Sequence, residues 1–453
     1  MPAAVARTAA FDILLRVECE GSYASELLHS AAYQRLSRAD HGLATELVMG
    51  VLRWRSLLDH EIAAASSQSL SKLDLEVLIA LRLAVYQFRQ LDRIPHRAAL
   101  HDSVELVKHA RKRSAAAFVN AVLRKLSTIS PGLWLADVAS PETLARTLAH
   151  PLWMVQRWAQ EYGLPAAAAI CNYDQSVPAT AIRPRAAMDG SQLMEDGIRL
   201  SSGNLLNSAR RVDAGDVTRT AAFRSGQIVV QDEASQLVAA LISADTLPLG
   251  SCVLDCCAAP GGKTLAIADR NPGASVSAVD IHPHRVRLLR KLLHAAGAAE
   301  RIAVIAADAV HLPLSSAFDR VLADVPCSGT GTLARNPEIK WRLTAADIAD
   351  LRGRQSAILR SAMAHVAPGG RLIYSTCSLE REENETVVEQ ALAEERSFRV
   401  LDCRAELDRL KSSGELAWNN TASLTRGPYL RTIPGLHPCD GFFAATLEKK
   451  GNR

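Results

Sequence analysis

The pattern of apolar residues changes once along the chain, and this change limits the possible folds more than any other feature. From about residue 250, short apolar strands alternate with amphipathic helices, which predicts a doubly wound parallel sheet. Before residue 128 no strand pattern occurs, and the apolar residues recur at three- and four-residue spacing. This spacing predicts helices over 45–64, 73–91, 96–110 and 116–127. We therefore expect an all-helical bundle followed by an α/β domain.

The residues between these two parts, 131–245, show a mixed pattern with short strand candidates at 179–186 and 226–232. We expect three domains: an all-helical domain over 1–130, a small mixed α/β connecting domain over 131–245 and an α/β domain over 246–453. The predicted strands of the last domain are 251–257, 274–280, 301–308, 318–325 and 370–378, with helices at 263–270, 282–297 and 344–366 and a last strand at the sheet edge over 441–448.

The composition of the 453 residues is that of an ordinary globular protein, 48% hydrophobic and 22% charged. No stretch approaches the ~20 apolar residues of a membrane span, and the N-terminal segment lacks the continuous apolar core of a signal peptide. Nine cysteines without a C-x-x-C pair disfavour a disulfide framework and a zinc site. We expect a cytoplasmic protein without a bound metal, and we take it to be a monomer.

Positive charge is concentrated in the helical part. Residues 1–130 contain 17 Lys and Arg against 13 Asp and Glu, a surplus equal to the +4 net charge of the whole chain. Its densest cluster is Arg111, Lys112 and Arg113. Such a cluster can be a solvated loop between helices, or it can lie beside a nucleic-acid site.

The segment "DCCAAPGGKT" (255–264) is similar to the end of a phosphate-binding loop but departs from it. The first glycine of G-x-x-x-x-G-K-[ST] would fall at Cys257, and Pro260 removes a backbone N–H donor. Gly261 and Gly262 still let the backbone approach a ligand closely. The loop therefore disfavours nucleotide hydrolysis and leaves room for another nucleoside ligand.

Acidic residues end successive strands of the predicted α/β domain. Asp280 lies about 20 residues after the glycine loop, which is the usual place of an acid that binds ribose hydroxyls. Asp308 is placed to accept a hydrogen bond from an adenine amine, and Asp324 ends the fourth strand. One aspartate often caps a helix, but three at successive strand ends favour a nucleoside site. A nucleoside that carries an amino acid, such as S-adenosylmethionine, fits this pattern.

Two cysteines, 50 residues apart, follow adjacent predicted strands. Cys327 lies in "DVPCSGTG", just after Asp324, and Cys377 lies in "STCS". A single cysteine at a strand end is more often a packing residue, but two at one ligand site beside an acid favour chemistry. A thiolate can attack carbon 6 of a pyrimidine and thereby activate carbon 5 for methylation.

The motifs "DCCAAPGGKT", "ADVPCSGTGTLARNPEIKW" and "IYSTCSLEREENETVV" resemble those of the RNA (cytosine-5)-methyltransferases. The segments "IPHRAALHDSVELVK" and "FVNAVLR" resemble the antitermination factor NusB. A NusB-like bundle fused to such a methyltransferase is the arrangement of enzymes that act on ribosomal RNA. The resemblance implies a Rossmann-like class I methyltransferase domain, S-adenosylmethionine as the cofactor, and methylation of a cytosine at carbon 5 in 16S rRNA of the small ribosomal subunit.

The same resemblance implies roles for individual residues. Cys377 corresponds to the nucleophile that attacks carbon 6, and Cys327 to the cysteine that helps to expel it. Asp324 would hold the cytosine and support proton transfer, and Lys263 would position the acids and the base. Cys256 departs from the family pattern and receives no role. The cofactor contacts would come from Cys257, Ala258, Ala259, Pro260, Gly261, Gly262, Lys263, Asp280, Arg285, Asp308 and Asp324.

Three alternative functions remain open at this stage. The same chemistry could act on tRNA, although the NusB-like fusion favours rRNA. A DNA cytosine methylase would not need Cys377, and a NusB-like RNA-binding protein with an idle methylase domain would not need either thiol. RNA recognition needs contacts beyond the target base. The candidates for these contacts, each of which could also be a plain solvated charge, are the basic cluster at 111–113 and Arg183, Arg185, Arg335 and Lys340.

Overall fold

A computed structural model describes residues 3–33, 35–129, 139–185, 193–194, 196–243, 247–315 and 317–451. By their contacts the residues form two compact units. Unit 1 comprises Met1–Val177 together with Leu333–Arg342, and unit 2 comprises Pro178–Thr332 together with Leu343–Arg453. The first predicted domain boundary, at 130/131, lies outside the described residues. The division into 1–130, 131–245 and 246–453 stays a prediction, and the contacts divide the chain at other positions.

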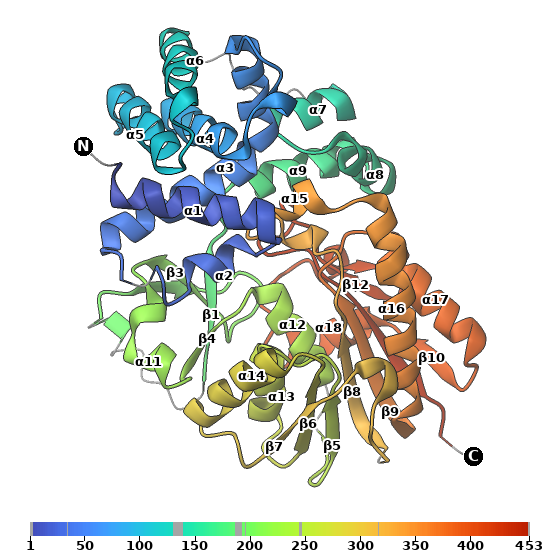
Figure 1. The fold of residues 1–453 in the computed structure, drawn as a ribbon. Helices are drawn as coiled ribbons and strands as arrows, with labels where there is room; N and C mark the ends of the chain where they lie inside the picture. The colour runs from blue at the N-terminus through green and yellow to red at the C-terminus, as the bar shows by residue number, and fades with distance from the viewer. Residues whose placement is uncertain are drawn as a thin grey trace. The chain divides into compact units, whose positions relative to one another are not determined.

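Unit 1 is helical throughout its described residues, as the sequence predicts (Figure 1). Its long helix α3 starts earlier than the predicted 45–64, because the Ser37 hydroxyl accepts a hydrogen bond from the Asp40 N–H (3.1 Å) and caps the helix. The apolar faces bury Phe11, Leu47 and Leu58 in one core. The helices are α1 (Val5–Glu20), α2 (Ala24–Leu28), α3 (Arg38–Ala65), α4 (Leu75–Gln90), α5 (His96–His109), α6 (Ala116–Thr128), α7 (Pro141–Thr147), α8 (Leu152–Tyr162), α9 (Leu164–Gln175) and α15 (Ile339–Arg342).

The segment Leu333–Arg342, which ends in α15, belongs to unit 1 although it lies far along the chain. Its side chains satisfy backbone groups at helix ends. Glu338 accepts a hydrogen bond from the Ala24 N–H at the start of α2 (2.8 Å). Arg342 donates to the carbonyls of Val17 (2.6 Å) and Gly21 (2.7 Å) at the end of α1. The segment is therefore built into the helical bundle.

Unit 2 begins with a small antiparallel sheet of strand order β2-β3-β1-β4. The two strand candidates at 179–186 and 226–232 are confirmed as β1 and β4, whereas β2 and β3 carry no apolar alternation and were not expected. The sheet and the elements that follow it are β1 (Thr180–Pro184), β2 (Arg199–Ser202), β3 (Arg210–Ala214), α11 (Ala221–Arg224), β4 (Ile228–Val230) and α12 (Glu233–Ile242).

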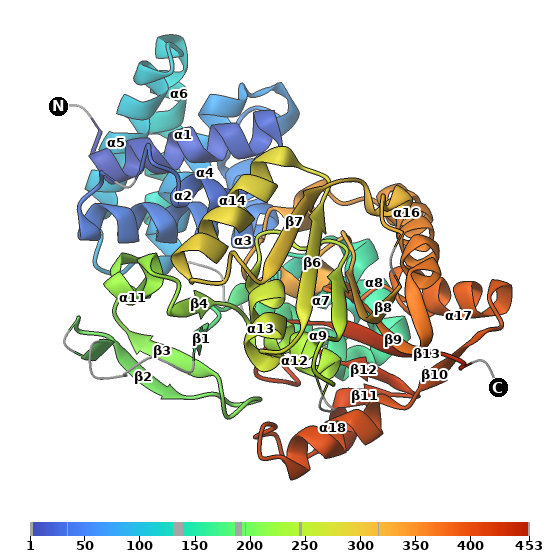
Figure 2. The same ribbon diagram turned by 90° about the horizontal axis from the view of Figure 1, so that it is seen from below.

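The larger sheet of unit 2 has the predicted doubly wound core. Its order is β11-β12-β13-β9-β8-β5-β6-β7, with β10 paired to β13. In Figures 1 and 2, α13 and α14 cover one face and α16 and α17 the other. The elements are β5 (Cys252–Asp255), α13 (Gly262–Arg270), β6 (Ser275–Asp280), α14 (Pro283–Ala295), β7 (Ile302–Ala306), β8 (Phe318–Asp324), α16 (Ala345–Ala364), β9 (Val366–Thr376), α17 (Glu385–Glu394), β10 (Phe398–Leu401), α18 (Cys403–Ser412), β11 (Thr425–Arg426), β12 (Tyr429–Arg431) and β13 (Phe443–Lys449).

The prediction of β13 as an edge strand is wrong. It pairs antiparallel with β9 on one side and with β12 and β10 on the other, because the unpredicted segment 398–431 adds further strands beyond it. The parallel strands β5 and β8 are neighbours, while the chain order runs outward from them in both directions. Ligands of such sheets bind at this switch point, beyond the carboxyl ends of the strands. No helix among the described residues is long and apolar enough to cross a membrane.

Candidate active site

The glycine loop joins β5 to α13 at the switch point of the large sheet. Gly261 has a φ of +115°, and a Cβ there would lie 2.6 Å from Leu289 Cδ1, so only glycine fits. The peptide bond between Ala259 and Pro260 is cis. Below the loop, the buried Asp255 accepts a hydrogen bond from the Thr264 hydroxyl (2.7 Å). Burial raises the pKa of Asp255 to about 7, although the Thr264 hydrogen bond opposes this shift.

Asp280 lies at the end of β6, next to the glycine loop. Its carboxylate accepts hydrogen bonds from the Ala259 N–H (3.3 Å) and the His282 N–H (2.9 Å). Arg285 donates to the Ala259 carbonyl (2.8 Å), and its guanidinium lies 3.7 Å from the Asp280 carboxylate. The predicted cofactor residues Ala259, Asp280 and Arg285 therefore form one connected group, and Arg285 is 43% exposed at its side chain.

Asp308 follows β7, the next strand of the sheet. One carboxylate oxygen accepts a hydrogen bond from the Val310 N–H (3.0 Å) and caps the short 3-10 turn η4 (Ala309–His311). Its other oxygen accepts no hydrogen bond from the described residues. Asp308 thus combines the ordinary cap role of an aspartate with an oxygen that remains available at the carboxyl edge of the sheet.

Asp324 ends β8 and is held from two directions. One carboxylate oxygen accepts a hydrogen bond from the Ser375 hydroxyl (2.7 Å), and the other accepts one from the Lys263 ammonium (2.8 Å). Burial alone would lower the pKa of Lys263, but the charge of Asp324 and the hydrogen bond to it outweigh burial and raise that pKa. Lys263 is therefore a cation fixed against a carboxylate. Its Nζ also lies 5.0 Å from the centre of the Phe442 ring.

The two cysteines singled out in the sequence lie together. Cys327 Sγ is 3.3 Å from Cys377 Sγ, and both side chains are partly exposed. Their contact and burial raise the pKa of the Cys327 thiol well above its usual range, and the charge of Cys377 and Glu383 adds to this rise. A neutral thiol at position 327 can donate a hydrogen bond to a thiolate at position 377. Negative charge on Cys377 also contributes to the raised pKa of Lys263.

The cysteines of the glycine loop differ from this pair. Cys256 is buried, and burial raises its pKa well above the usual range. Burial likewise raises the pKa of Cys257. Both thiols therefore stay protonated, and the fully buried Cys256 acts as a small packing group. Among the described residues no group of three or more His, Cys, Asp or Glu side chains could hold a metal ion.

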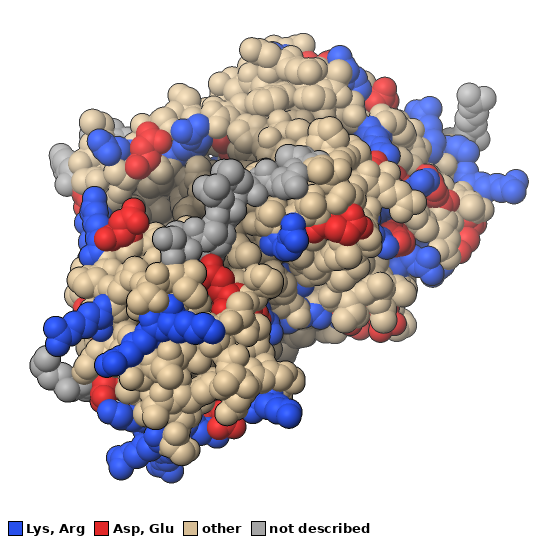
Figure 3. Space-filling view, turned by 90° about the horizontal axis from the view of Figure 1, so that it is seen from above, with Lys and Arg blue, Asp and Glu red and all other residues tan. Residues whose placement is uncertain are grey.

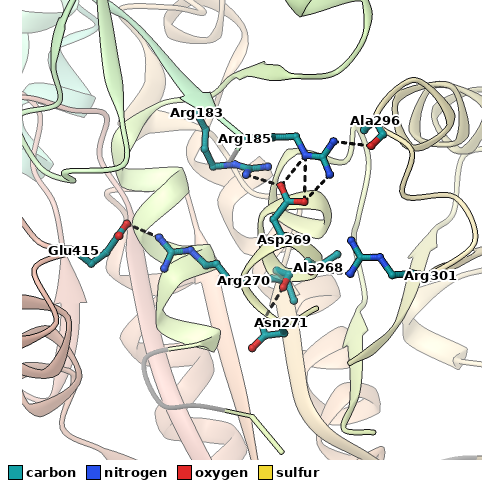
Figure 4. A network of polar contacts seen from close by, with 10 residues as sticks. Arg183, Arg185, Ala268, Asp269, Arg270, Asn271, Ala296, Arg301 and Glu415 are labelled. Carbon is teal, nitrogen blue, oxygen red and sulfur yellow. Dashed lines mark hydrogen bonds and ion pairs between the residues drawn. The ribbon is translucent and has the colours of Figure 1, made fainter. Parts of the chain in front are cut away.

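Arg183 and Arg185, two candidates for RNA contacts, are bound inside unit 2 (Figure 4). Both donate to the carboxylate of Asp269, Arg183 at 2.8 Å and Arg185 at 2.8 to 3.1 Å. Arg185 also donates to the Ala296 carbonyl (2.6 Å). Their guanidinium groups join β1 and the segment after it to α13 and to the residue that follows α14. This arrangement indicates a structural role for the pair.

The prediction of Lys340 as an RNA contact is wrong. It is 1% exposed and donates to the carbonyls of Arg53 (2.9 Å) and Ala149 (3.1 Å) within unit 1. Arg335, by contrast, is half-buried. In the basic cluster Lys112 forms ion pairs with acidic side chains, whereas Arg111 and Arg113 are exposed. Figure 3 shows one face of the molecule, where small groups of basic side chains have acidic side chains between them.

Sequence reasoning did not assign roles to four polar residues around the thiols, namely Ser328, Ser375, Ser378 and Glu383. Ser375 holds Asp324, and Glu383 accepts hydrogen bonds from Ser328 and Ser378, the residues that directly follow the two cysteines. The "PCSG", "STCS" and "EENE" segments contain these residues and could have drawn attention to them. Nothing in the letters shows, however, that Glu383 folds back onto both cysteine loops.

Comparisons with known proteins match both parts of the chain. The family model described as 16S rRNA methyltransferase RsmB/F matches residues 247–448, and the NusB family model matches residues 4–128. A probable ribosomal RNA small subunit methyltransferase B from Bacillus subtilis is 33% identical over 461 residues, covering 98% of this chain and 99% of that protein.

Two solved structures share the fold. The crystal structure of PH0851 covers 99% of this chain and 100% of its own, with a TM-score of 0.80 and 22% identity. A methyltransferase homologue from Pyrococcus horikoshii covers 67% of this chain and 97% of its own, with a TM-score of 0.55 and 25% identity. The two-part match to family models and the full-length likeness to the Bacillus protein lead to one conclusion: the chain belongs to the RsmB/F family of methyltransferases.

Proposed function

We propose that the protein methylates carbon 5 of a cytosine in 16S rRNA through a covalent cysteine–cytosine adduct, with S-adenosylmethionine as the methyl donor. The observation that carries the proposal is the 3.3 Å separation of Cys327 Sγ and Cys377 Sγ next to the ion pair of Lys263 and Asp324 (2.8 Å). Two thiols, a carboxylate and a cation at one edge of the sheet are the groups that this chemistry needs.

In the proposed reaction the Cys377 thiolate bonds to carbon 6 of the cytosine. Asp324 holds the ring and supports proton transfer to it, so electron density gathers at carbon 5. Carbon 5 bonds to the transferred methyl group and then gives its own proton to a water molecule. The carbon 6–sulfur bond breaks, which restores the aromatic ring. Because Cys327 carries the raised pKa, its thiol is suited to donate a hydrogen bond to Cys377 as that sulfur leaves.

S-adenosylmethionine would supply a methyl group activated by a positively charged sulfur. The residues present fit it: Gly261 and Gly262 offer a loop without Cβ atoms, Asp280 is placed for ribose hydroxyls, and Asp308 keeps one oxygen available for an adenine amine. The further cofactor residues in the proposal are those of the stretch 257–263 with Arg285 and Asp324.

The names of the relatives support an RNA substrate, and the NusB-like match over 4–128 supports a role for the helical part in RNA binding. A target base inside a helix must leave its stack before a thiol can reach its ring. The separate RNA-binding role of 1–130 and the connecting role of 131–245 belong to this proposal, as do a cytoplasmic location and action as a monomer.

The test uses the two cysteines separately. With 16S rRNA and S-adenosylmethionine, Cys377→Ala should lose methyl transfer completely. Cys327→Ala should instead accumulate a protein–RNA adduct, seen as a band of reduced mobility on a denaturing gel. Normal transfer by Cys377→Ala would contradict the assigned roles.

Bisulfite sequencing of ribosomal and transfer RNA from cells with and without the gene identifies the target. A lost signal in tRNA alone would overturn the rRNA substrate.

A further inference from the structure

The loops that carry the two thiols are joined by one buried carboxylate. Glu383 ends the short 3-10 turn η6 (Arg381–Glu383) and is 0% exposed. Its first oxygen accepts hydrogen bonds from the Ser328 N–H (2.8 Å) and the Gln355 amide (2.8 Å). Its second accepts from the hydroxyls of Ser328 and Ser378, the latter at 2.5 Å. One side chain therefore binds the residue after Cys327 and the residue after Cys377.

Because the Glu383 carboxylate is buried, its stability depends on these hydrogen bonds. A carboxylate removed from water is strongly unfavourable unless hydrogen bonds replace the lost solvation. Here four donors surround it, and hydrogen bonds to a charged acceptor are among the strongest in proteins. If either serine moved away, Glu383 would lose donors that no solvent could replace. The carboxylate thus resists any motion that separates the two loops.

Further contacts also hold the Cys327 and Cys377 loops together. The Ser328 and Ser378 hydroxyls lie 3.0 Å apart, and the Gly331 N–H donates to the Cys377 carbonyl (2.9 Å). Gly331 lies so close to Gly441 that a Cβ would come within 2.2 Å of the Gly441 carbonyl oxygen. The position of Glu383 is itself fixed, because the Tyr374 hydroxyl donates to its backbone carbonyl (2.5 Å).

We propose that Glu383 is a positioning residue that sets the distance between the two thiols. It touches neither the cytosine nor the donor in the proposed reaction and acts through Ser328 and Ser378. The inference rests on the proposed function for its catalytic meaning, since two cysteines that act in turn on one base must stay close together. The spacing itself can be measured without any methyl transfer.

The experiment compares Glu383→Ala with Glu233→Ala in the full-length protein. Glu233 is a matched control, because it is 2% exposed in the same unit and accepts hydrogen bonds from three backbone N–H groups at 204–206, none of which belongs to the loops of Cys327 and Cys377. Diamide oxidises two neighbouring thiols to a disulfide and takes up their two hydrogens as it becomes a hydrazine. Mass spectrometry of a non-reducing digest follows the linked Cys327–Cys377 peptides over time.

Wild type should form this disulfide rapidly, because the sulfurs need to move only from 3.3 Å to bonding distance. Glu383→Ala should slow its formation at least about tenfold, since a displacement near 1 Å strongly reduces proximity. Glu233→Ala should form it at nearly the wild-type rate. An unchanged rate in Glu383→Ala, or equal slowing in both variants, overturns the proposal.

Two further variants keep the test decisive if Glu383→Ala does not fold. Glu383→Gln retains an oxygen for the Ser328 N–H and offers an amide to hydroxyls that can rotate, so it should restore part of the rate. Ser378→Ala removes a single donor and should slow disulfide formation less than Glu383→Ala does. Faster disulfide formation in Ser378→Ala than in wild type would contradict the positioning role of Glu383. If the protein methylates RNA as proposed, Glu383→Gln should lower kcat and leave KM for RNA unchanged. If the proposed function is wrong, the rates of disulfide formation still test the positioning role of Glu383.

Discussion

Two lysines that are largely removed from water have pKa values shifted in opposite directions, one lysine in each unit. Lys263 in unit 2 has a side chain 13% exposed and lies 2.8 Å from the Asp324 carboxylate. Lys340 in unit 1 is 1% exposed, and its hydrogen-bond partners among the described residues are the backbone carbonyls of Arg53 and Ala149. Burial lowers the pKa of Lys340 to about 7, whereas the carboxylate keeps the pKa of Lys263 raised.

The difference shows what decides the charge of a buried lysine. Burial disfavours the ammonium in both places, and only a carboxylate in direct contact reverses the effect. Above about pH 7 the amine of Lys340 is mostly neutral and has two N–H donors, which match the two carbonyls that it contacts. Burial lowers the pKa of the nearby His150 well below the usual range, so its ring is also uncharged. The helical unit therefore uses its lysine for structure, and the methyltransferase unit uses its lysine as a cation.

The largest expected effect comes from removing the cation of Lys263. Lys263→Met leaves the Asp324 carboxylate without its ion pair and removes the positive charge that interacts with Cys377. We expect the rate of methyl transfer at saturating RNA to fall about 100-fold or more, the usual scale for losing a group that supports proton transfer. Lys340→Met is the matched control and should leave this rate near wild type. Equal losses in both variants would show that the two lysines do not differ in role.

The pH dependence of stability should separate the lysines next. An unfolded lysine has a pKa near 10.4, so the unfolded chain binds a proton that folded Lys340 lacks between about pH 7 and 10. The contribution of Lys340 to the free energy of unfolding therefore rises with pH across this window, by up to about 4 kcal/mol. Lys263 has a raised folded pKa, so its contribution is fully present below about pH 10 and is lost only at higher pH.

Urea unfolding at pH 7 and pH 9.5 measures this difference. Five of the six tryptophans lie in unit 1 and only Trp418 lies in unit 2, so tryptophan emission mainly follows the unit that contains Lys340. The gain in free energy of unfolding between the two pH values should be larger in wild type than in Lys340→Met. Lys263→Met should show the same gain as wild type. A parallel response of wild type and Lys340→Met would mean that Lys340 remains charged in the folded protein.

The fold was largely predictable because its signals are periodic. The switch from helical spacing to alternating strands gave the bundle, the parallel core and the switch point with its glycine loop. The failures are elements with weak or no periodicity, such as β2 and β3, and the later segment 398–431, which moves β13 away from the edge. Membership of Leu333–Arg342 in unit 1 was also hidden, because it depends on contacts with residues some 300 positions away in the sequence.

The site was predictable where strand ends fix a residue's place. Asp280, Asp308, Asp324 and the two cysteines follow strands whose order determines their neighbours, so spacing alone brought them to one edge. The charge state and partner of an individual side chain do not follow from its position in the chain. Lys340 and Lys263 are the same residue type, and only the three-dimensional environment shows that Lys263 faces a carboxylate.

A third lysine gives the smallest expected effect and completes the series. Lys112 lies at the surface, 3.1 Å from the Asp74 carboxylate and 3.9 Å from that of Glu76, so its charge is already partly neutralised. Arg111 and Arg113 beside it are exposed and form no ion pair with another described residue. If the basic cluster contacts RNA phosphates, the two arginines should account for most of the attraction.

The measurement is RNA affinity as a function of salt concentration. Replacing Arg111 and Arg113 together by Ala should weaken binding and flatten the slope of log K against log salt by about 0.7 to 0.9 for each phosphate that the protein no longer neutralises. Lys112→Ala should change the slope less than either arginine does, because its acidic partners oppose its contribution. An equal flattening by Lys112→Ala would show that its ion pairs open when RNA binds. An unchanged slope in the double arginine variant would remove the cluster from the RNA-binding surface.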